Sequence, residues 1–535
     1  MSDDKPQGLA RGLTHYGDAG FALFLRRSFA RSMGYSTALL AEPTIGIASA
    51  ASDLNNCHRH FPELIDAVKR GVLAAGGLPL AFPTISLGEV FLHPTSLMYR
   101  NLMAMDVEEM CRAQPLDAVV LVGGCDKTVP AQLMGAASAG VPAIGLVAGP
   151  MLTARHDGER LGACTDCRRF WAKFRSDEID RTTLDRVETK LATTAGTCAV
   201  MGTASTMACV AEALGMLLPG TAAIPAVHAD RLRAAEATGR AAVALARSRL
   251  TIDRIVTPAA VENALKVLLA IGGSTNAIIH LTAIAGRLGI PVSLKHLNEL
   301  SDATPVLVDL KPTGAHYMED FFAAGGMSAV LHELKPLLDL DSPAGGLVAL
   351  FGSLAPNGAI LKRSAADARL FERTGRAVVF SSPSDLAARI DDPALDVEPD
   401  DFLIMQNAGP KSGYGMPEAG YLPIPARLAR AGVKDMVRIS DARMSGTAYG
   451  TVVLHVSPEA AIGGPLALVQ TGDRIRLSVR ERSLDLEVDT AVLARRKAQW
   501  RASPLPPRGY QRLYAERVLQ AEEGCDFDFL RSATR

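Results

Sequence analysis

Short apolar runs that alternate with helical patterns constrain the fold of this 535-residue chain more than any other feature. Runs of strand length, bounded by Gly or Pro, lie at Pro43–Ala48, Leu78–Phe82, Ala118–Val122 and Pro142–Val147. Helical patterns lie between them, over Glu63–Ala75 and Met98–Cys111. Such alternation is typical of βαβ units, in which helices cover both faces of a mostly parallel sheet. The sequence therefore predicts an α/β fold.

The C-terminal part has a different periodicity. Apolar and polar residues alternate along two neighbouring segments, with Ile475, Leu477 and Val479 on the first and Leu484, Leu486 and Val488 on the second. A period of two on both segments predicts an antiparallel hairpin. We therefore expect an α/β domain over residues 1–365 and a β-rich domain over residues 366–535, with the boundary falling between Gly345 and Asp396.

The balance of charges excludes several classes of partner. Lys and Arg total 56 against 57 Asp and Glu, and aromatic residues are only 5%, so we expect no nucleic-acid surface. The polar N-terminus does not resemble a signal peptide, and the stretch nearest to a membrane span, Gly140–Leu152, is interrupted by Pro142 and Pro150. We expect a cytoplasmic protein that binds no membrane, with its eight cysteines as reduced thiols or metal ligands.

Three cysteines follow predicted strands or precede a predicted helix. Cys57 and Cys125 follow β runs, and Cys198 opens a helical pattern that ends at Leu214-Gly215. Ligands bind at the carboxyl ends of strands in open α/β sheets, and a helix N-terminus stabilises a thiolate. The three thiols could converge on zinc or an iron–sulfur cluster and leave one coordination position open. The alternative for each is a buried core thiol.

Two other motifs have weaker claims to metal binding. Cys164-Thr-Asp-Cys167 is the only C-x-x-C in the chain, and without a second pair or a thioredoxin-like context we interpret it as non-catalytic. His58 and His60 could ligate a metal as H-x-H, but a polar role in the loop is favoured.

Carboxylates and one serine complete the set of candidate residues. Glu89, Asp126 and Glu418 lie in loops and could supply the oxygen ligands that Mg²⁺ prefers, although each could equally be a solvated loop acid. Ser445 precedes Gly446 in a turn of small residues, where backbone N–H groups can face a hydroxyl; a surface serine is the alternative. No G-x-S-x-G motif is present, so a hydrolase triad is not expected.

Taken together, these motifs resemble the dihydroxy-acid dehydratase/phosphogluconate dehydratase family. The resemblance extends from about Pro43 to about Trp500, and Ser440–Gly450 is similar to the sugar-acid branch of that family. The motifs that carry it are Asn56-Cys57, Gly123-Gly124-Cys125-Asp126-Lys127-Thr128, Gly196-Thr197-Cys198, the segment from Gly409-Pro410-Lys411 to Pro417-Glu418, and Ser440–Gly450.

The resemblance implies two cofactors and a serine base. The implied ligands are Cys57, Cys125 and Cys198 for a [2Fe–2S] cluster, and Glu89, Asp126, Glu418 and a carbamylated Lys127 for Mg²⁺. Ser445 matches the catalytic base, and Thr447 lies close enough in sequence to assist it. The resemblance also implies a barrel-like C-terminal domain that carries Ser445, and a homodimer or homotetramer. Three thiolates can also hold a [4Fe–4S] cluster, so the number of irons stays open.

The implied reaction is the dehydration of a 2,3-dihydroxy sugar acid, an aldonate such as L-arabinonate or D-xylonate, to a 2-keto-3-deoxy acid. Ser412-Gly413-Tyr414 replaces a glycine-proline run of many relatives in a loop that we expect to shape the substrate pocket. Three alternatives remain: a dihydroxy-acid dehydratase of branched-chain amino-acid synthesis, a non-catalytic iron–sulfur redox sensor, and a zinc-stabilised structural protein.

Overall fold

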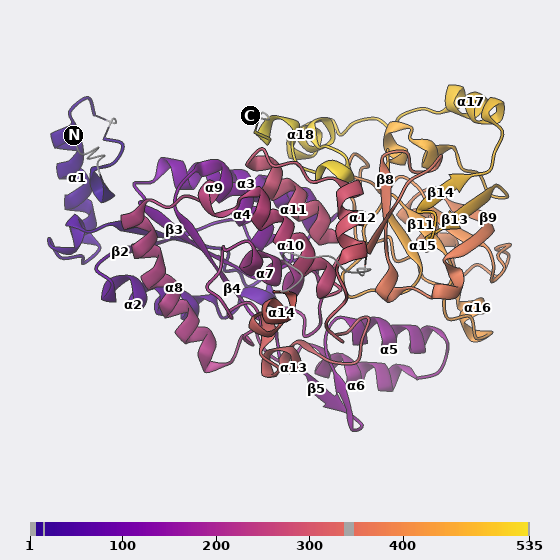
Figure 1. The fold of residues 1–535 in the computed structure, drawn as a ribbon, viewed down its shortest axis with the longest axis horizontal. Helices are drawn as coiled ribbons and strands as arrows, with labels where there is room; N and C mark the ends of the chain where they lie inside the picture. Colours follow the sequence, from indigo (N-terminus) through magenta and orange to yellow (C-terminus); the bar gives the residue numbers. More distant parts are fainter. Residues whose placement is uncertain (1–6, 14–15, 336–346, 533–535) are drawn as a thin grey trace.

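A computed structural model describes residues 7–13, 16–335 and 347–532 of the chain. Its first part contains a four-stranded parallel sheet in the order β2-β1-β3-β4 (Figure 1). The strands are β1 (Thr44–Ser49), β2 (Leu78–Pro83), β3 (Ala118–Gly123) and β4 (Ala143–Val147). All four coincide with the predicted runs to within about a residue, so the α/β prediction is confirmed.

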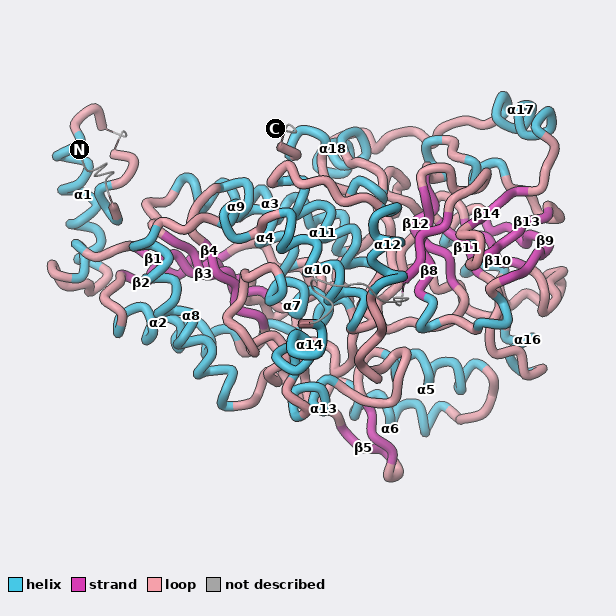
Figure 2. Tube along the Cα trace, in the orientation of Figure 1, coloured by secondary structure: helices cyan, strands magenta, loops and turns pink. Residues whose placement is uncertain are grey.

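Helices surround this sheet, as the cyan tubes in Figure 2 show. The two helical patterns predicted between the strands correspond to α2 (Phe61–Ala74) and α3 (Ser96–Ala113). Thr257 caps a later helix, α10 (Pro258–Ala270), by accepting a hydrogen bond from the Ala260 N–H. The helices are α1 (Ala19–Ser32), α2 (Phe61–Ala74), α3 (Ser96–Ala113), α4 (Thr128–Ala139), α5 (Thr165–Arg175), α6 (Arg181–Leu191), α7 (Thr203–Ala213), α8 (Ala229–Ser248), α9 (Ile252–Ile255), α10 (Pro258–Ala270), α11 (Asn276–Arg287), α12 (Leu294–Ala303), α13 (Met318–Ala323) and α14 (Gly326–Leu334). A short hairpin of β5 (Ala154–His156) and β6 (Glu159–Leu161) precedes α5.

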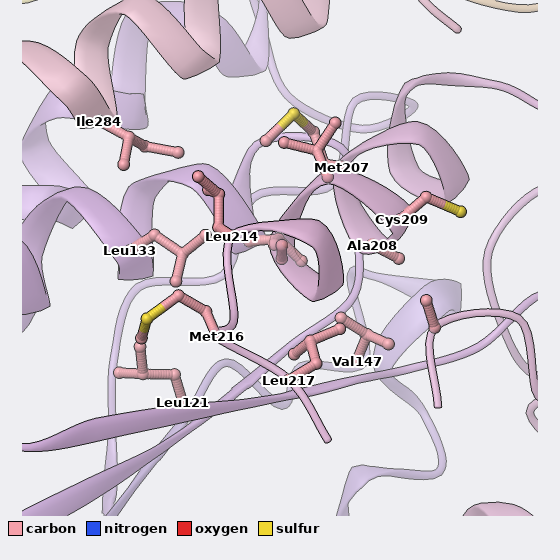
Figure 3. Close-up of a cluster of buried hydrophobic side chains, with 14 of the residues drawn as sticks. Leu121, Leu133, Val147, Met207, Ala208, Cys209, Leu214, Met216, Leu217 and Ile284 are labelled. Atoms are coloured by element: carbon pink, nitrogen blue, oxygen red, sulfur yellow. The ribbon is translucent and has the colours of Figure 1, made fainter. Parts of the chain in front are cut away.

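The main hydrophobic core lies between this sheet and its helices. Figure 3 shows one part of it, where Leu121 of β3 and Val147 of β4 lie near side chains of α7 and α11. Cys209 of α7 belongs to this core, and Cys111 and Cys525 are also buried. These three cysteines are thus packing residues in the structure.

Helices α2 and α8 pack closely because each places a glycine at the contact. A Cβ on Gly71 would overlap the backbone carbonyl of Glu236, and a Cβ on Gly239 would overlap that of Val68. Backbone cannot move aside as a flexible side chain can, so both positions require glycine.

We therefore expect Gly71→Ala to lower the free energy of unfolding by at least about 1–3 kcal/mol, as measured by denaturant titration. Gly286→Ala is the matched helical control, because the nearest heavy atom to its added methyl group would be Arg531 Nε at 3.4 Å. The control should be neutral or gain up to about 1 kcal/mol from helix propensity. Equal effects of the two substitutions would contradict this account of the contact.

The second sheet has eight strands and mixed direction, in the order β14-β13-β9-β10-β11-β12-β8-β7. Strands β9 to β12 run parallel, and the outer pairs are antiparallel. The strands are β7 (Leu347–Leu350), β8 (Gly358–Lys362), β9 (Glu372–Phe380), β10 (Phe402–Met405), β11 (Arg438–Ser440), β12 (Val452–Ser457), β13 (Arg474–Ser478) and β14 (Ser483–Leu486). Helices α15 (Pro383–Arg389), α16 (Ala426–Arg430), α17 (Thr490–Gln499) and α18 (Gly509–Arg517) complete this part.

The two ends of the eight-stranded sheet meet. Phe351 directly follows β7 and forms a bridge with Ser483 of β14, and the Leu484 N–H donates to the Phe351 carbonyl at 2.8 Å. The sheet is thus nearly closed, which confirms the barrel-like expectation, and β13–β14 is the predicted hairpin. Strands β7 and β8 lie before residue 366, and Gly345 lies outside the described residues, so the division into domains stays a prediction.

The C-terminal end of the chain returns to the helices of the first part (Figure 1). The Arg287 guanidinium of α11 forms a buried ion pair with Asp526 at 2.7 Å. The Arg100 guanidinium of α3 donates to the carbonyl oxygens of Gly524 and Cys525 at 2.8 and 2.9 Å. The segment of residues 524–526 is therefore fixed to α3 and α11. Among the described residues, no helix combines the length and the hydropathy that crossing a membrane requires.

Candidate active site

Three carboxylates from distant parts of the chain converge in the structure. One oxygen each from Glu89, Asp126 and Glu418 lies within 4.8 Å of the others. Glu89 lies between β2 and α3, Asp126 between β3 and α4, and Glu418 between β10 and α16. Three oxygen donors at this separation match the ligands that Mg²⁺ takes in proteins.

Side chains around Glu89 fix its carboxylate in the charged form. Thr95 Oγ1 donates to it at 2.9 Å, and Ser96 Oγ at the start of α3 donates to its other oxygen. Burial alone would raise the pKa of Glu89, but the cations of Arg443 and Lys127 outweigh it and lower the pKa to about 2. Glu89 is thus ready to bind a cation at neutral pH.

Arg443 is a site residue that sequence reasoning missed. Its side chain is fully buried and lies between two of the carboxylates, 2.9 Å from Glu89 and 2.5 Å from Glu418. It also donates to Thr95 Oγ1 and to the Met416 carbonyl. The only available signal was its place in the Ser440–Gly450 motif, since the sequence does not show which side chains of that motif face the carboxylates.

Lys127 lies beside the three carboxylates of Glu89, Asp126 and Glu418, here called the acidic group. Its side chain is fully buried, and its Nζ contacts Asp126 and lies 3.7 Å from Glu89. Three carboxylates therefore face two cations, Lys127 and Arg443. The predicted Mg²⁺ ligands, including the amine that would be carbamylated, are thus neighbours in space.

Cys125 joins the acidic group to a thiol group. Its Sγ donates to Asp126 Oδ1 at 3.3 Å. A hydrogen bond with the Cys57 thiol and burial together raise the pKa of Cys125 well above its usual range. Cys57 and Cys125 are therefore in contact, as a shared cluster requires.

His58 positions Cys125 through the backbone N–H of that cysteine. Its Nδ1 lies 2.7 Å from the Ala50 carbonyl, so that nitrogen carries the proton, and its Nε2 accepts from the Cys125 N–H at 2.9 Å. Burial lowers the pKa of His58 to about 4. His60 also makes a hydrogen bond to the backbone, since its Nε2 lies 3.0 Å from the Ala148 carbonyl oxygen. The favoured interpretation of this pair as polar loop residues agrees with these contacts.

We expect His58 to make stability depend on pH. Because the pKa is lower in the folded state than the unfolded value of 6.5, its contribution is complete above pH 6.5 and is lost as pH falls towards 4. The loss reaches about 3 kcal/mol at pH 4. In His58→Gln, whose side-chain oxygen can accept the same N–H, the free energy of unfolding should fall less between pH 7 and pH 4. Parallel pH profiles would contradict the assignment.

Cys198 lies in an irregular segment, and the prediction that it opens a helix is wrong. Helix α7 begins only at Thr203. Thr197 instead forms a parallel β-bridge with Pro150, in the segment that follows β4, and this extended pairing prevents a helix from starting there. The Thr197 N–H donates to the Gly149 carbonyl at 2.9 Å, and the Ala148 N–H donates to that of Gly123. This pairing brings Cys198 to the sheet edge that carries Cys125.

The Cys164-Thr-Asp-Cys167 motif also lies at the site. Cys164 Sγ is 2.9 Å from Cys198 Sγ, and Thr165 Oγ1 donates to the Thr447 carbonyl at 3.3 Å. Sequence reasoning set this motif aside because it has no second pair. In the structure its neighbour is a cysteine 34 residues further along the chain.

Backbone pairing holds the turn of Ser445 beside the loop that carries Glu418. Ala419 and Met444 form an antiparallel bridge, which places Ser445 opposite Glu418. Ser445 Oγ is 2.7 Å from Thr447 Oγ1 and accepts from the Thr447 N–H at 3.3 Å. The hydroxyl is therefore presented with a backbone donor, as the turn of small residues predicts.

Two family models match consecutive parts of the chain and together cover residues 42–525. The dihydroxy-acid/6-phosphogluconate dehydratase N-terminal model matches residues 42–346, and the corresponding C-terminal model matches residues 334–525. The chain belongs to this dehydratase family. The protein is thus a hydro-lyase, and the resemblance found from its motifs is confirmed.

Individual relatives of this dehydratase cover almost its full length. It is 45% identical to an L-arabonate dehydratase of Azospirillum brasilense, over 99% of this chain and 98% of the relative. It is 43% identical to a 6-deoxy-6-sulfo-D-gluconate dehydratase of Pseudomonas putida, over 92% and 91%. It is 38% identical to a dihydroxy-acid dehydratase of Methanoregula boonei, over 95% and 98%.

The loop that supplies Glu418 to the dehydratase has a second face. Ser412, Gly413 and Tyr414 line a cleft of about 930 Å³ together with Trp500 and residues 502–507. The Tyr414 hydroxyl lies 2.8 Å from Ser384 Oγ. The loop thus contributes Glu418 to the acidic group and Tyr414 to this cleft. The influence of the loop on the choice of substrate stays a prediction.

Proposed function

We propose that this dehydratase removes water from a 2,3-dihydroxy sugar acid, an aldonate such as L-arabinonate or D-xylonate, and releases a 2-keto-3-deoxy acid. The observation that carries the proposal is the convergence of Glu89, Asp126 and Glu418, next to which the Ala419–Met444 bridge brings the turn of Ser445. The substrate class rests on the relatives, since the named sugar-acid dehydratases are more similar to the chain than the named dihydroxy-acid dehydratase.

The chemistry of the donor groups fits the two implied cofactors. The acidic group offers Mg²⁺ the oxygens of Glu89, Asp126 and Glu418, and Lys127 becomes a fourth anionic ligand if its amine is carbamylated. The thiols of Cys57, Cys125 and Cys198 would hold a [2Fe–2S] cluster. Of these sulfurs, those of Cys57 and Cys125 are joined by a hydrogen bond.

The base in this reaction is Ser445. When bound, Mg²⁺ would offset the charge that builds up near the substrate carboxylate, and cluster iron would act as a Lewis acid for the C3 hydroxyl. Ser445 Oγ takes the C2 proton, and the electron pair of that bond forms the C2=C3 bond as the hydroxyl leaves. The Thr447 N–H and hydroxyl stabilise the negative charge on Ser445 that this step needs. The enol product then tautomerises to the 2-keto acid.

A panel of substrates tests the proposed function. Anaerobically purified protein, with and without Mg²⁺, is offered L-arabinonate, D-xylonate, D-gluconate and 2,3-dihydroxyisovalerate, and 2-keto acid formation is followed. We expect turnover of at least one pentonate to exceed that of 2,3-dihydroxyisovalerate by 10-fold or more. A preference for 2,3-dihydroxyisovalerate would instead identify a branched-chain biosynthetic enzyme. The cytoplasmic location and the homodimeric or homotetrameric assembly stay predictions.

A further inference from the structure

Two thiols of the site have no role in the proposed dehydration. Cys164 Sγ lies 2.9 Å from Cys198 Sγ, and the Cys164 and Cys167 thiols are joined by a hydrogen bond. The three sulfurs thus form a continuous row, here called the thiol row, that ends on Cys198. All three residues are half-buried, whereas Cys125, Cys111, Cys209 and Cys525 are buried.

The backbone fixes the thiol row from both sides. The Ala199 N–H donates to the Ala163 carbonyl at 2.9 Å, so the residues next to Cys164 and Cys198 are paired directly. Asp166 is buried within the motif and accepts from the Gly162 N–H and the Tyr317 hydroxyl, each at 2.8 Å. The short distance between the sulfurs is therefore a property of two anchored segments rather than of two free side chains.

We propose that Cys164 and Cys198 form a reversible disulfide when Cys198 holds no cluster, and that Cys167 is the thiol that reopens it. A low-molecular-weight disulfide such as glutathione disulfide is the oxidant: the two protein thiols lose two protons and two electrons, and the oxidant is reduced to two thiols. The Cys167 sulfur then attacks Cys164, which forms a Cys164–Cys167 disulfide and releases Cys198 as a thiol. This second step is an exchange and needs no further oxidant.

The thiol row would therefore control access of iron to Cys198. A cluster ligand that is locked in a disulfide cannot bind iron, and the C-x-x-C pair returns it to the free state. The inference depends on the proposed function only in assigning Cys198 to the cluster. The disulfide itself follows from the positions of the sulfurs.

Peptide mapping of the full-length protein tests the disulfide. Protein with its cluster, and the same protein after the iron is removed by a chelator, are incubated with glutathione disulfide, blocked with iodoacetamide and digested with trypsin without reduction. Cleavage after Arg160, Arg168, Lys190 and Arg231 places Cys164 and Cys167 on residues 161–168, and Cys198 and Cys209 on residues 191–231, so fragmentation of the linked peptides identifies which cysteine is joined. We expect a cross-link between these peptides in the iron-free protein, and at least 10-fold less of it in the protein that carries its cluster.

Variants assign the roles within the row. Cys164→Ser should abolish the cross-link, while the control Cys111→Ser, which removes a buried thiol of the core, should leave its yield unchanged. Cys167→Ser should retain the cross-link and, after oxidation, take up less than half of the iron that the oxidised wild type takes up on reconstitution.

Iron-free Cys167→Ser cannot carry out the exchange, so the absence of the cross-link from this variant would overturn the proposal, as would a Cys164→Ser variant with an undiminished cross-link. Equal iron uptake by oxidised Cys167→Ser and wild type would overturn the role of Cys167. If the reduced protein binds no iron at all, the proposed function fails while the cross-link stands, so the two failures are distinguishable.

Discussion

Replacement of Ser445 by Ala is expected to lower kcat by about 10²- to 10⁴-fold, the usual loss when a general base is removed. The loss follows from the place of Ser445 opposite Glu418 and beside the segment that carries Cys164. Only the contacts with Thr447 are lost, so the free energy of unfolding should change by no more than about 1 kcal/mol. Steady-state kinetics on the best aldonate, with iron content measured on the same samples, checks the prediction.

Thr447→Val provides a graded comparison for Ser445. It removes the hydroxyl that lies 2.7 Å from Ser445 Oγ but keeps the backbone N–H that donates to it. We expect a loss of kcat that is smaller than that of Ser445→Ala. Full activity of Ser445→Ala with normal iron content would show that another group takes the C2 proton.

Replacement of Arg443 by Met is expected to lower the free energy of unfolding by up to about 3–5 kcal/mol, because it leaves the half-buried carboxylates of Glu89 and Glu418 without their shared cation. Burial outweighs the attraction of Arg443 in Glu418 and already raises the pKa of that carboxyl group. A divalent cation can replace part of the missing positive charge. Added Mg²⁺ should therefore stabilise Arg443→Met more than it stabilises the wild type, as measured by denaturant titration.

Arg438→Met is the matched control. Arg438 is equally buried and forms a 2.6 Å ion pair with Asp435, but it has no contact with the three carboxylates. Its loss should also destabilise the protein, yet Mg²⁺ should have the same effect on this variant as on the wild type. If Mg²⁺ acted equally on both variants, the acidic group would not be the site at which it binds.

The strands and the acidic residues could be predicted because their signals are local. Apolar runs bounded by Gly or Pro locate β1 to β4 within about a residue, and the period of two locates the β13–β14 hairpin. The motifs around Asp126 and Glu418 are likewise short, continuous stretches of sequence. Patterns of this kind can be recognised without knowing which residues are in contact in the folded chain.

The remaining site residues depend on contacts that no local pattern reveals. Arg443 belongs to the site because its guanidinium meets Glu89, which lies 354 residues away in the sequence. Cys164 lies beside Cys198 because the Ala163 carbonyl accepts from the Ala199 N–H, a pairing outside any regular strand. The expected helix at Cys198 failed for the same reason, since tertiary pairing of Thr197 overrides the local helical pattern.

The anchoring of Asp526 and its neighbours to α3 and α11 has a consequence for how the chain matures. Asp526 is translated 239 residues after Arg287, and Gly524 is translated 424 residues after Arg100. A nascent chain that already holds the four-stranded sheet and its cysteines must therefore wait until Asp526 has been translated before Arg287 gains its buried partner. Loss of residues 524–526 would thus weaken two helices that are synthesised much earlier.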